Sequence, residues 1–188
     1  MKFVVIDGLD GAGKSTQADL LYNQFKNQGL NVILRNHPSQ NTTYGVKSKN
    51  ALIKTGKINH LKATIFYGLD VLYSLNNYYN ADDIDILIFS RYTLAVVYLP
   101  SIMNSIIYKI VTIILPVSNY MFFLDVSPKE SLKRLEERGE VEEMFENKDA
   151  LLKARKKSLK ITSTWNIIDA DKDIIEVNKE IIEIINNS

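Results

Sequence analysis

Eight residues near the start of the chain have the types and the spacing of a phosphate-binding loop. Residues 8–15 read G-L-D-G-A-G-K-S and so fit the pattern G-x-x-x-x-G-K-S. Glycines in such a loop let successive backbone N–H groups turn toward an anion, and the helix that follows adds positive partial charge. In phosphoryl-transfer proteins the loop lysine, here Lys14, reaches the β- and γ-phosphates, and the next hydroxyl, here Ser15, ligates Mg²⁺. The chemistry indicated is the binding of a nucleoside triphosphate.

The segments on either side of the loop have the patterns that such a loop requires. Residues 2–7 are mostly apolar and rich in β-branched side chains, which is typical of a buried parallel strand. From Ser15 onward the apolar residues recur with helical spacing. A strand, a glycine-rich turn and a helix in this order are the context of a true phosphate loop. The alternative, a glycine turn with an exposed lysine, would require neither element.

A second group of cations follows much later in the chain. Arg91 comes directly after a predicted strand, at the carboxyl end of the sheet, where ligands bind in open α/β folds. Arg134 and Arg138 lie at the end of a predicted helix, before Gly139 and the charged residues 140–146, a segment that can close over phosphates as a lid. Two alternatives stay open. Arg91 could be a structural arginine that pairs with a helix end, and the other two, spaced i,i+4 among glutamates, could belong to a solvated helix face.

The composition predicts one globular domain. The chain has 188 residues, of which 46% are hydrophobic, and its formal net charge of +1 argues against a general binder of nucleic acid. There is no cysteine, and His37 and His60 lack metal-ligand spacing, so we expect both on the surface. The most apolar region, residues 106–124, contains polar residues and a proline, which favours a helix followed by a strand over a membrane span. No signal peptide is apparent, and we expect a cytoplasmic protein without a membrane partner.

Strand-like and helix-like segments alternate along the whole chain. This pattern predicts an α/β fold, a five-stranded parallel sheet with helices on both faces, in a single domain over residues 1–188 with a lid at about 138–147. We expect a loop at residues 36–45. The first helix should stop at Gly29, and Ser127 with Pro128 should begin a later one. The remaining expected strands are residues 31–34, 84–89, 121–126 and 165–168, and the remaining expected helices are a long one at 58–79 and a C-terminal one over 174–185.

The chain resembles the thymidylate kinase family, whose members transfer a phosphoryl group from ATP to dTMP. The strongest part is residues 5–18, V-I-D-G-L-D-G-A-G-K-S-T-Q-A, and the ordered combination is far more specific than the loop alone. A small GTPase is disfavoured because no N-K-x-D segment follows a strand at the required place. The other matching parts are Pro38 followed by Gly45, residues 66–70, Arg91-Tyr92, residues 123–126, the 134–146 segment and residues 165–170.

The resemblance implies a P-loop kinase that uses ATP and Mg²⁺ and acts on a small nucleoside monophosphate. Phe66 or Tyr67 would stack on the acceptor base, although both could simply be core residues. A homodimer packed through the long helices is also implied, and residues 102–115 could supply contact surface. The implied catalytic residues are Asp10, Lys14, Arg91 and Arg138. The implied ATP-binding residues are Gly8, Leu9, Asp10, Gly11, Ala12, Gly13, Lys14, Ser15, Thr16 and Arg134, with Ser15 as the metal ligand. The implied acceptor-binding residues are Pro38, Gln40, Phe66, Tyr67, Asp70, Arg91 and Tyr98.

The chain departs from the family at three places. Ser90 stands where the family has an acid that organises Mg²⁺, so Asp7 or Asp10 would have to compensate. Gln40 stands where the family offers an arginine to the acceptor phosphate. Asp70 or Val71, depending on a one-residue shift in alignment, replaces an arginine that reads the thymine carbonyl.

These departures leave two further hypotheses about function. An acceptor range broader than dTMP, including bases with an exocyclic amine, follows from the loss of the base-reading donor, as does a kinase for another deoxynucleotide. A nucleotide-binding regulatory protein or pseudo-enzyme follows from Ser90 and Gln40.

Overall fold

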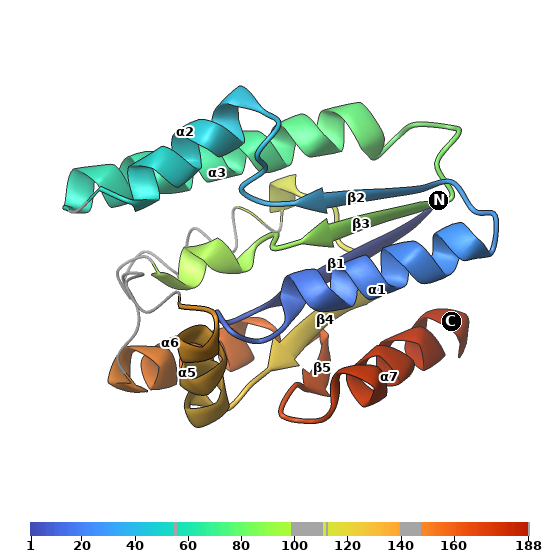
Figure 1. Ribbon diagram of the computed structural model, residues 1–188. Helices are drawn as coiled ribbons and strands as arrows, with labels where there is room; N and C mark the ends of the chain where they lie inside the picture. The colour runs from blue at the N-terminus through green and yellow to red at the C-terminus, as the bar shows by residue number, and fades with distance from the viewer. Residues whose placement is uncertain (55, 99–110, 112, 140–147, 188) are drawn as a thin grey trace.

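The computed structural model describes residues 1–54, 56–98, 111, 113–139 and 148–187 (Figure 1). Its strands and helices alternate as the sequence predicts. In chain order they are β1 Lys2–Gly8, α1 Lys14–Asn27, β2 Val32–Asn36, α2 Thr43–Leu52, α3 Lys57–Tyr78, β3 Ile86–Ser90, the 3-10 helix η1 Leu94–Tyr98, β4 Tyr120–Asp125, α5 Pro128–Glu137, α6 Lys148–Ile161, β5 Asn166–Asp169 and α7 Ile174–Asn187.

The sheet is parallel and has β1 at its centre. Its five strands lie in the order β2-β3-β1-β4-β5, and Val5 of β1 stands opposite Phe89 of β3 and Met121 of β4. Because every pairing is parallel, the carboxyl ends of all five strands meet at one edge, on the left in Figure 1. The segments that follow β1 and β3 are therefore brought together at that edge, as the sequence predicts for ligand-binding residues.

Both faces of the sheet are covered, which explains why its strands are almost continuously apolar. Val4 and Ile6 of β1 face a core formed with α1, α6 and α7. Phe3 and Val5 alternate to the other face, where they pack with α3, η1 and Trp165. A strand buried on both faces has no solvent side on which polar residues would alternate.

The predicted helix ends are confirmed. Gly29, just past α1, has a left-handed φ of 83°, and its N–H donates to the carbonyl of Lys26. Ser127 caps α5 by accepting a hydrogen bond from the Glu130 N–H at 3.3 Å, and Pro128 occupies the first helical position. These local signals depend only on neighbouring residues, so they can be seen in the sequence.

The expected loop at residues 36–45 is shorter than predicted, because α2 begins at Thr43. Thr42 caps this helix by accepting the N–H of Gly45 at 2.9 Å. Gly45 must lack a side chain, since a Cβ there would collide with the Ser39 carbonyl oxygen. The helix buries only small residues, among them Ser48 and Ala51, so it shows no apolar stripe by which the sequence could have predicted it.

The apolar region at residues 106–124 is described only in part. Its strand is confirmed as β4, whereas most of its expected helix lies outside the described residues. Of the helices that the structure describes, none has the length and apolar composition needed to cross a bilayer.

Candidate functional site

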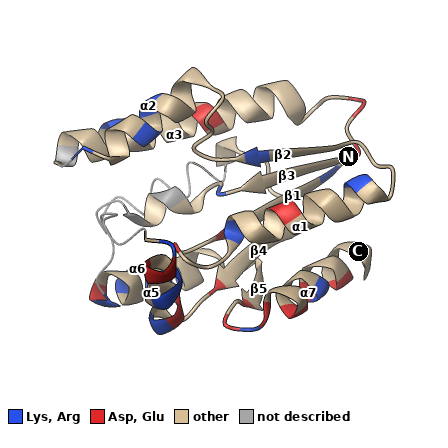
Figure 2. Ribbon diagram, in the orientation of Figure 1, with Lys and Arg blue, Asp and Glu red and all other residues tan. Residues whose placement is uncertain are grey.

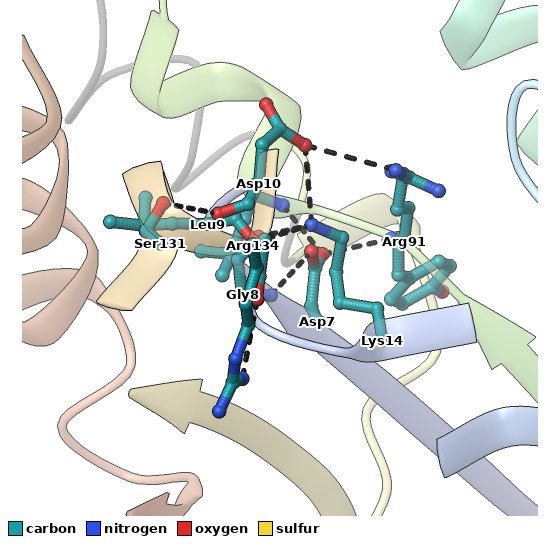
Figure 3. A network of polar contacts seen from close by, with 11 residues as sticks. Asp7, Gly8, Leu9, Asp10, Lys14, Arg91, Ser131 and Arg134 are labelled. Atoms are coloured by element: carbon teal, nitrogen blue, oxygen red, sulfur yellow. Dashed lines mark hydrogen bonds and ion pairs between the residues drawn. The ribbon is translucent and has the colours of Figure 1, made fainter. Parts of the chain in front are cut away.

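The glycine-rich loop wraps between the end of β1 and the start of α1 (Figure 3). Gly11 and Gly13 have left-handed φ angles of 74° and 86°, which glycine adopts without steric cost. A Cβ on Gly11 would lie 2.7 Å from the carbonyl oxygen of Ser131 in α5. The Ser131 hydroxyl in turn donates to the Asp10 carbonyl at 2.6 Å. The loop is therefore pressed against α5 and held in shape by it.

Lys14 lies inside this loop with its amine turned back toward the backbone. Its Nζ donates to the carbonyl oxygens of Gly8 at 3.0 Å and Leu9 at 2.7 Å, and it lies 3.4 Å from Asp10 Oδ1. Burial lowers the pKa of Lys14, and the Asp10 carboxylate opposes that shift. A cation held by carbonyl oxygens in a buried loop can exchange them for phosphate oxygens.

Arg91 reaches the same carboxylate from a different strand. Its Nη2 lies 3.7 Å from Asp10 Oδ1, and its side chain is 37% exposed (Figure 3). The backbone of Arg91 has a φ of 65°, a left-handed conformation that is uncommon outside glycine. The predicted convergence of Lys14 and Arg91 is thus confirmed as geometry, because β1 and β3 are adjacent and parallel.

Asp7 ties the end of β1 to the segment that carries Arg91. Its carboxylate accepts three backbone N–H groups, from Gly8 at 2.9 Å, Tyr92 at 2.8 Å and Leu94 at 3.2 Å. Burial raises the pKa of Asp7, and the charge of Lys14 and these hydrogen bonds oppose the rise. The structure thus gives Asp7 a structural task, where the sequence left it as a candidate for charge compensation near Mg²⁺.

Ser90 lies at the end of β3 and is fully buried. Its Oγ has no hydrogen-bond partner among the described residues. Because this residue is a serine, the position at which the resemblance implies an acid carries no charge.

The residues available for Mg²⁺ are few. Ser15, the expected metal ligand, is the second residue of α1 and is exposed. Across the described ranges, no three carboxylate or histidine side chains gather into a metal site. In phosphoryl-transfer sites Mg²⁺ is commonly bound by substrate phosphates, waters and only one or two protein ligands.

Arg134, for which the resemblance implies a role in the lid, contacts the phosphate loop. It donates to the carbonyls of Gly11 at 3.3 Å and Ala170 at 3.0 Å, and to Glu130 at 2.9 Å. It therefore joins the loop, α5 and the end of β5, which neither of the two expectations for this residue foresaw. Arg138 caps α5 and is exposed. Residues 140–147 of the expected lid lie outside the described residues.

Asp70 and Val71, the two candidates for reading the acceptor base, are both buried. Val71 is a core residue in contact with the sheet. Asp70 is fully buried on α3, where its carboxylate accepts the N–H and hydroxyl of Ser39 and the hydroxyl of Thr42. In this arrangement Asp70 holds the loop after β2 and does not face an open site.

Other expected acceptor-binding residues have mixed positions. Tyr67 is half-buried, and its hydroxyl donates to the Tyr92 carbonyl at 3.2 Å, so it packs against the segment after Arg91. Phe66 is half-buried, with the Lys47 amine 5.5 Å from its ring centre. Pro38 and Gln40 lie in the loop after β2, half-buried and exposed respectively, while the side chain of Tyr98 is outside the described residues.

His37 is a residue that sequence reasoning misplaced. The sequence predicts a surface position, yet His37 is 1% exposed, and its ring packs edge-on against Phe89 with 4.7 Å between the ring centroids. Its Nδ1 lies 3.0 Å from the Arg91 carbonyl oxygen, and its Nε2 lies 2.9 Å from Ser74 Oγ. One signal was available, because His37 follows β2 just as Arg91 follows the neighbouring β3.

Comparisons with known proteins agree with this geometry. A family model described as thymidylate kinase matches residues 6–181. A curated protein named probable thymidylate kinase, from Methanococcus aeolicus, is 32% identical over 162 residues, covering 85% of this chain and 79% of that one. Another of that name, from Thermococcus kodakarensis, is 37% identical over 76 residues, and this match spans only 37% of its length. The solved thymidylate kinase from Candida albicans has a TM-score of 0.78 at 22% identity, over 99% of this chain and 91% of that one, which supports the fold.

Proposed function

Because the chain belongs to the thymidylate kinase family, we propose that it transfers the γ-phosphoryl group of ATP to a nucleoside monophosphate, with dTMP as its principal acceptor. One observation carries this proposal most directly: Lys14 and Arg91 meet at Asp10 beside the glycine-rich loop. Phosphoryl transfer needs little covalent chemistry from the protein and depends on positioning and charge neutralisation. Two cations that converge from the segments after β1 and β3 supply both.

Each residue of the site has a separate role in this proposal. The loop amides and Lys14 would hold the phosphates of ATP, and Ser15 would hold Mg²⁺, which would neutralise charge on the phosphate oxygens. Arg91, partly exposed and opposite Lys14 across Asp10, contacts the phosphoryl group between donor and acceptor. Asp7 keeps the Arg91 segment at this distance through its hydrogen bonds to the N–H groups of Tyr92 and Leu94.

The acceptor range is broader than dTMP under this proposal. With Val71 in the core and the Asp70 carboxylate engaged by Ser39 and Thr42, α3 presents neither residue as a donor to a thymine carbonyl. A site without that donor discriminates bases weakly. Amino-bearing monophosphates such as dCMP are therefore expected to bind as well.

A homodimer through α3 is part of the proposal. Five apolar residues recur along this helix and remain 37–72% exposed, and Figure 2 shows that α3 carries little charge. Apolar side chains at helical spacing that face solvent in one copy are expected to be covered by a second copy. These residues, called the α3 stripe below, are Ile58, Leu61, Ile65, Leu69 and Leu72.

A coupled assay of ADP release tests the proposed activity. Release that depends on both Mg²⁺·ATP and dTMP supports the kinase. ATP binding without turnover on any monophosphate would instead favour the nucleotide-binding regulatory protein that Ser90 and Gln40 suggest. The cytoplasmic location stays a prediction.

A further inference from the structure

The backbone of Arg91 is held in its left-handed conformation from several sides. Its N–H donates to the Ile6 carbonyl of β1 at 2.9 Å, and the next N–H, of Tyr92, donates to Asp7. Its own carbonyl oxygen lies 3.0 Å from His37 Nδ1, on the segment after β2. A non-glycine residue persists at positive φ only where its surroundings determine it, and such residues cluster at functional sites. The contacts that hold Arg91 in this conformation come from Ile6 and Asp7 of β1 and from His37 after β2.

The hydrogen bonds around His37 allow only one neutral form of its ring. The Arg91 carbonyl can only accept, so Nδ1 carries the proton. On the other side the Arg35 Nε–H donates to Ser74 Oγ at 3.1 Å, and the Ser74 hydroxyl then donates to His37 Nε2 at 2.9 Å. The Arg91 carbonyl thus fixes the tautomer, and the Ser74 hydroxyl, which accepts from Arg35 and still has its own proton to donate, is compatible with it.

The charged groups around the ring favour this neutral form. Arg35 of β2 and Arg91 of the β3 end oppose a second proton, whereas Asp70 of α3 favours one. Tyr67 of α3 faces the ring as a neutral phenol, and burial and nearby carboxylates raise its pKa. Burial is the largest influence and lowers the pKa of His37 to about 4. The ring is therefore neutral wherever a kinase of this type would be assayed.

We propose that His37 is a positioning residue: its Nδ1–H holds the Arg91 carbonyl and thereby keeps the Arg91 guanidinium turned toward Asp10 and the phosphate loop. This inference rests on the proposed function, since it concerns how the kinase orients its arginine. Without the donor, the Arg91 backbone loses its contact with the β2 end and can rotate away from positive φ. A reacting group displaced by about an ångström can cost on the order of 100-fold in rate.

Two amide variants distinguish the hydrogen bond at His37 Nδ1 from the one at Nε2. In His37→Asn the side-chain N–H₂ can take the place of Nδ1 and donate to Arg91, whereas in His37→Gln the amide reaches the Nε2 side near Ser74. We expect His37→Gln to lower kcat by about 10- to 100-fold with the KM for ATP within about 3-fold, and His37→Asn to retain most of kcat. His60→Gln, on α3, is the matched control and should leave kcat unchanged. Equal losses in the Asn and Gln variants would overturn the proposal, because a merely structural role predicts them.

A double-mutant cycle provides a second test of whether His37 acts through Arg91. In an Arg91→Ala background, His37→Gln should cause little further loss of kcat, since it acts through Arg91. A full and additive loss would contradict the proposal. Amide hydrogen exchange at Arg91, read by NMR, needs no turnover: protection should persist in the Asn variant and fall in the Gln variant. If the wild-type protein phosphorylates no monophosphate, the proposed function fails, while the exchange measurement still decides the role of His37.

Discussion

Lys14 and Arg91 approach the same oxygen of Asp10, at 3.4 Å and 3.7 Å, although they lie on different strand–helix units. The two cations therefore share one carboxylate in a loop whose glycines and buried lysine are typical of phosphate binding. The arrangement keeps both cations near the loop. It also places them on the same side of the molecule, as a shared role in phosphoryl transfer requires.

Replacing Lys14 by methionine should abolish most of the activity. The variant loses the only amine inside the loop among the described residues, and removal of one charge-stabilising donor costs on the order of 100-fold or more in kcat. The ADP-release assay and ATP titration calorimetry measure this. Lys26→Met, at the exposed last turn of the same helix, is the matched control. Near-normal turnover in Lys14→Met would rule out the phosphate role.

Arg134→Met should destabilise the protein more than it changes the acceptor preference. The substitution removes the hydrogen bonds from a charged group to the part-buried carbonyls of Gly11 and Ala170, which costs about 1–3 kcal/mol of unfolding free energy. Urea denaturation measures the loss, with Lys133→Met as a neighbouring exposed control. An unchanged midpoint would show that the link between the loop and β5 does not stabilise the fold.

Asp70→Asn should loosen the loop after β2. An amide cannot accept all three hydrogen bonds from Ser39 and Thr42, and its N–H₂ would face their donors. We expect weaker binding of dTMP with little change in ATP binding, measured by calorimetry, and Asp82→Asn as the exposed control. If ATP and dTMP affinity fall equally, the loop is not specific to the acceptor.

A thermal-shift panel of monophosphates tests the acceptor range on the wild-type protein. Stabilisation by both dTMP and dCMP is expected because α3 offers neither Asp70 nor Val71 as a donor to the base. Selective stabilisation by dTMP alone would end the idea of a broader range.

The stability of the protein should fall below neutral pH because of His37. Its pKa is lowered to about 4 in the folded state, from an ordinary value near 6.5, so the unfolded chain binds a proton that the folded one refuses between those values. Stability is therefore fully present above about pH 6.5 and is lost as the pH falls toward 4. Between pH 7 and pH 5 the unfolding free energy should fall by about 2 kcal/mol through His37 alone. Urea denaturation of wild type and His37→Asn should show a smaller loss in the variant, and identical losses would refute the assignment.

Charge placed on the α3 stripe should produce monomers. Leu61→Glu with Ile65→Glu puts two carboxylates where a second copy is expected to pack, and burying them unpaired is costly. Light scattering after size-exclusion chromatography measures the mass. Ile175→Glu, on α7 and at least as exposed as Leu61 and Ile65, is the control and should leave the mass unchanged. A monomeric wild-type protein would contradict the dimer.

Much of the architecture was predictable because its causes are local. The strands are short apolar runs. Gly29 and Ser127 mark helix ends through their own backbone and side-chain chemistry, and two glycines of the phosphate loop adopt positive φ angles that glycine favours. The helix α2 escaped prediction because it buries only small side chains, Gly45 among them, and so carries no apolar period.

The site divides in the same way. The amino-acid order alone determined the phosphate loop, the position of Arg91 after a strand and the alternation that makes the sheet parallel, since each depends on residues close together in the chain. Only the tertiary structure decided that Asp70 holds a loop, that Arg134 lies beneath the phosphate loop and that His37 is buried against Arg91. Those roles arise from contacts between distant segments, where burial and hydrogen-bond partners, and not residue type, determine what a polar side chain does.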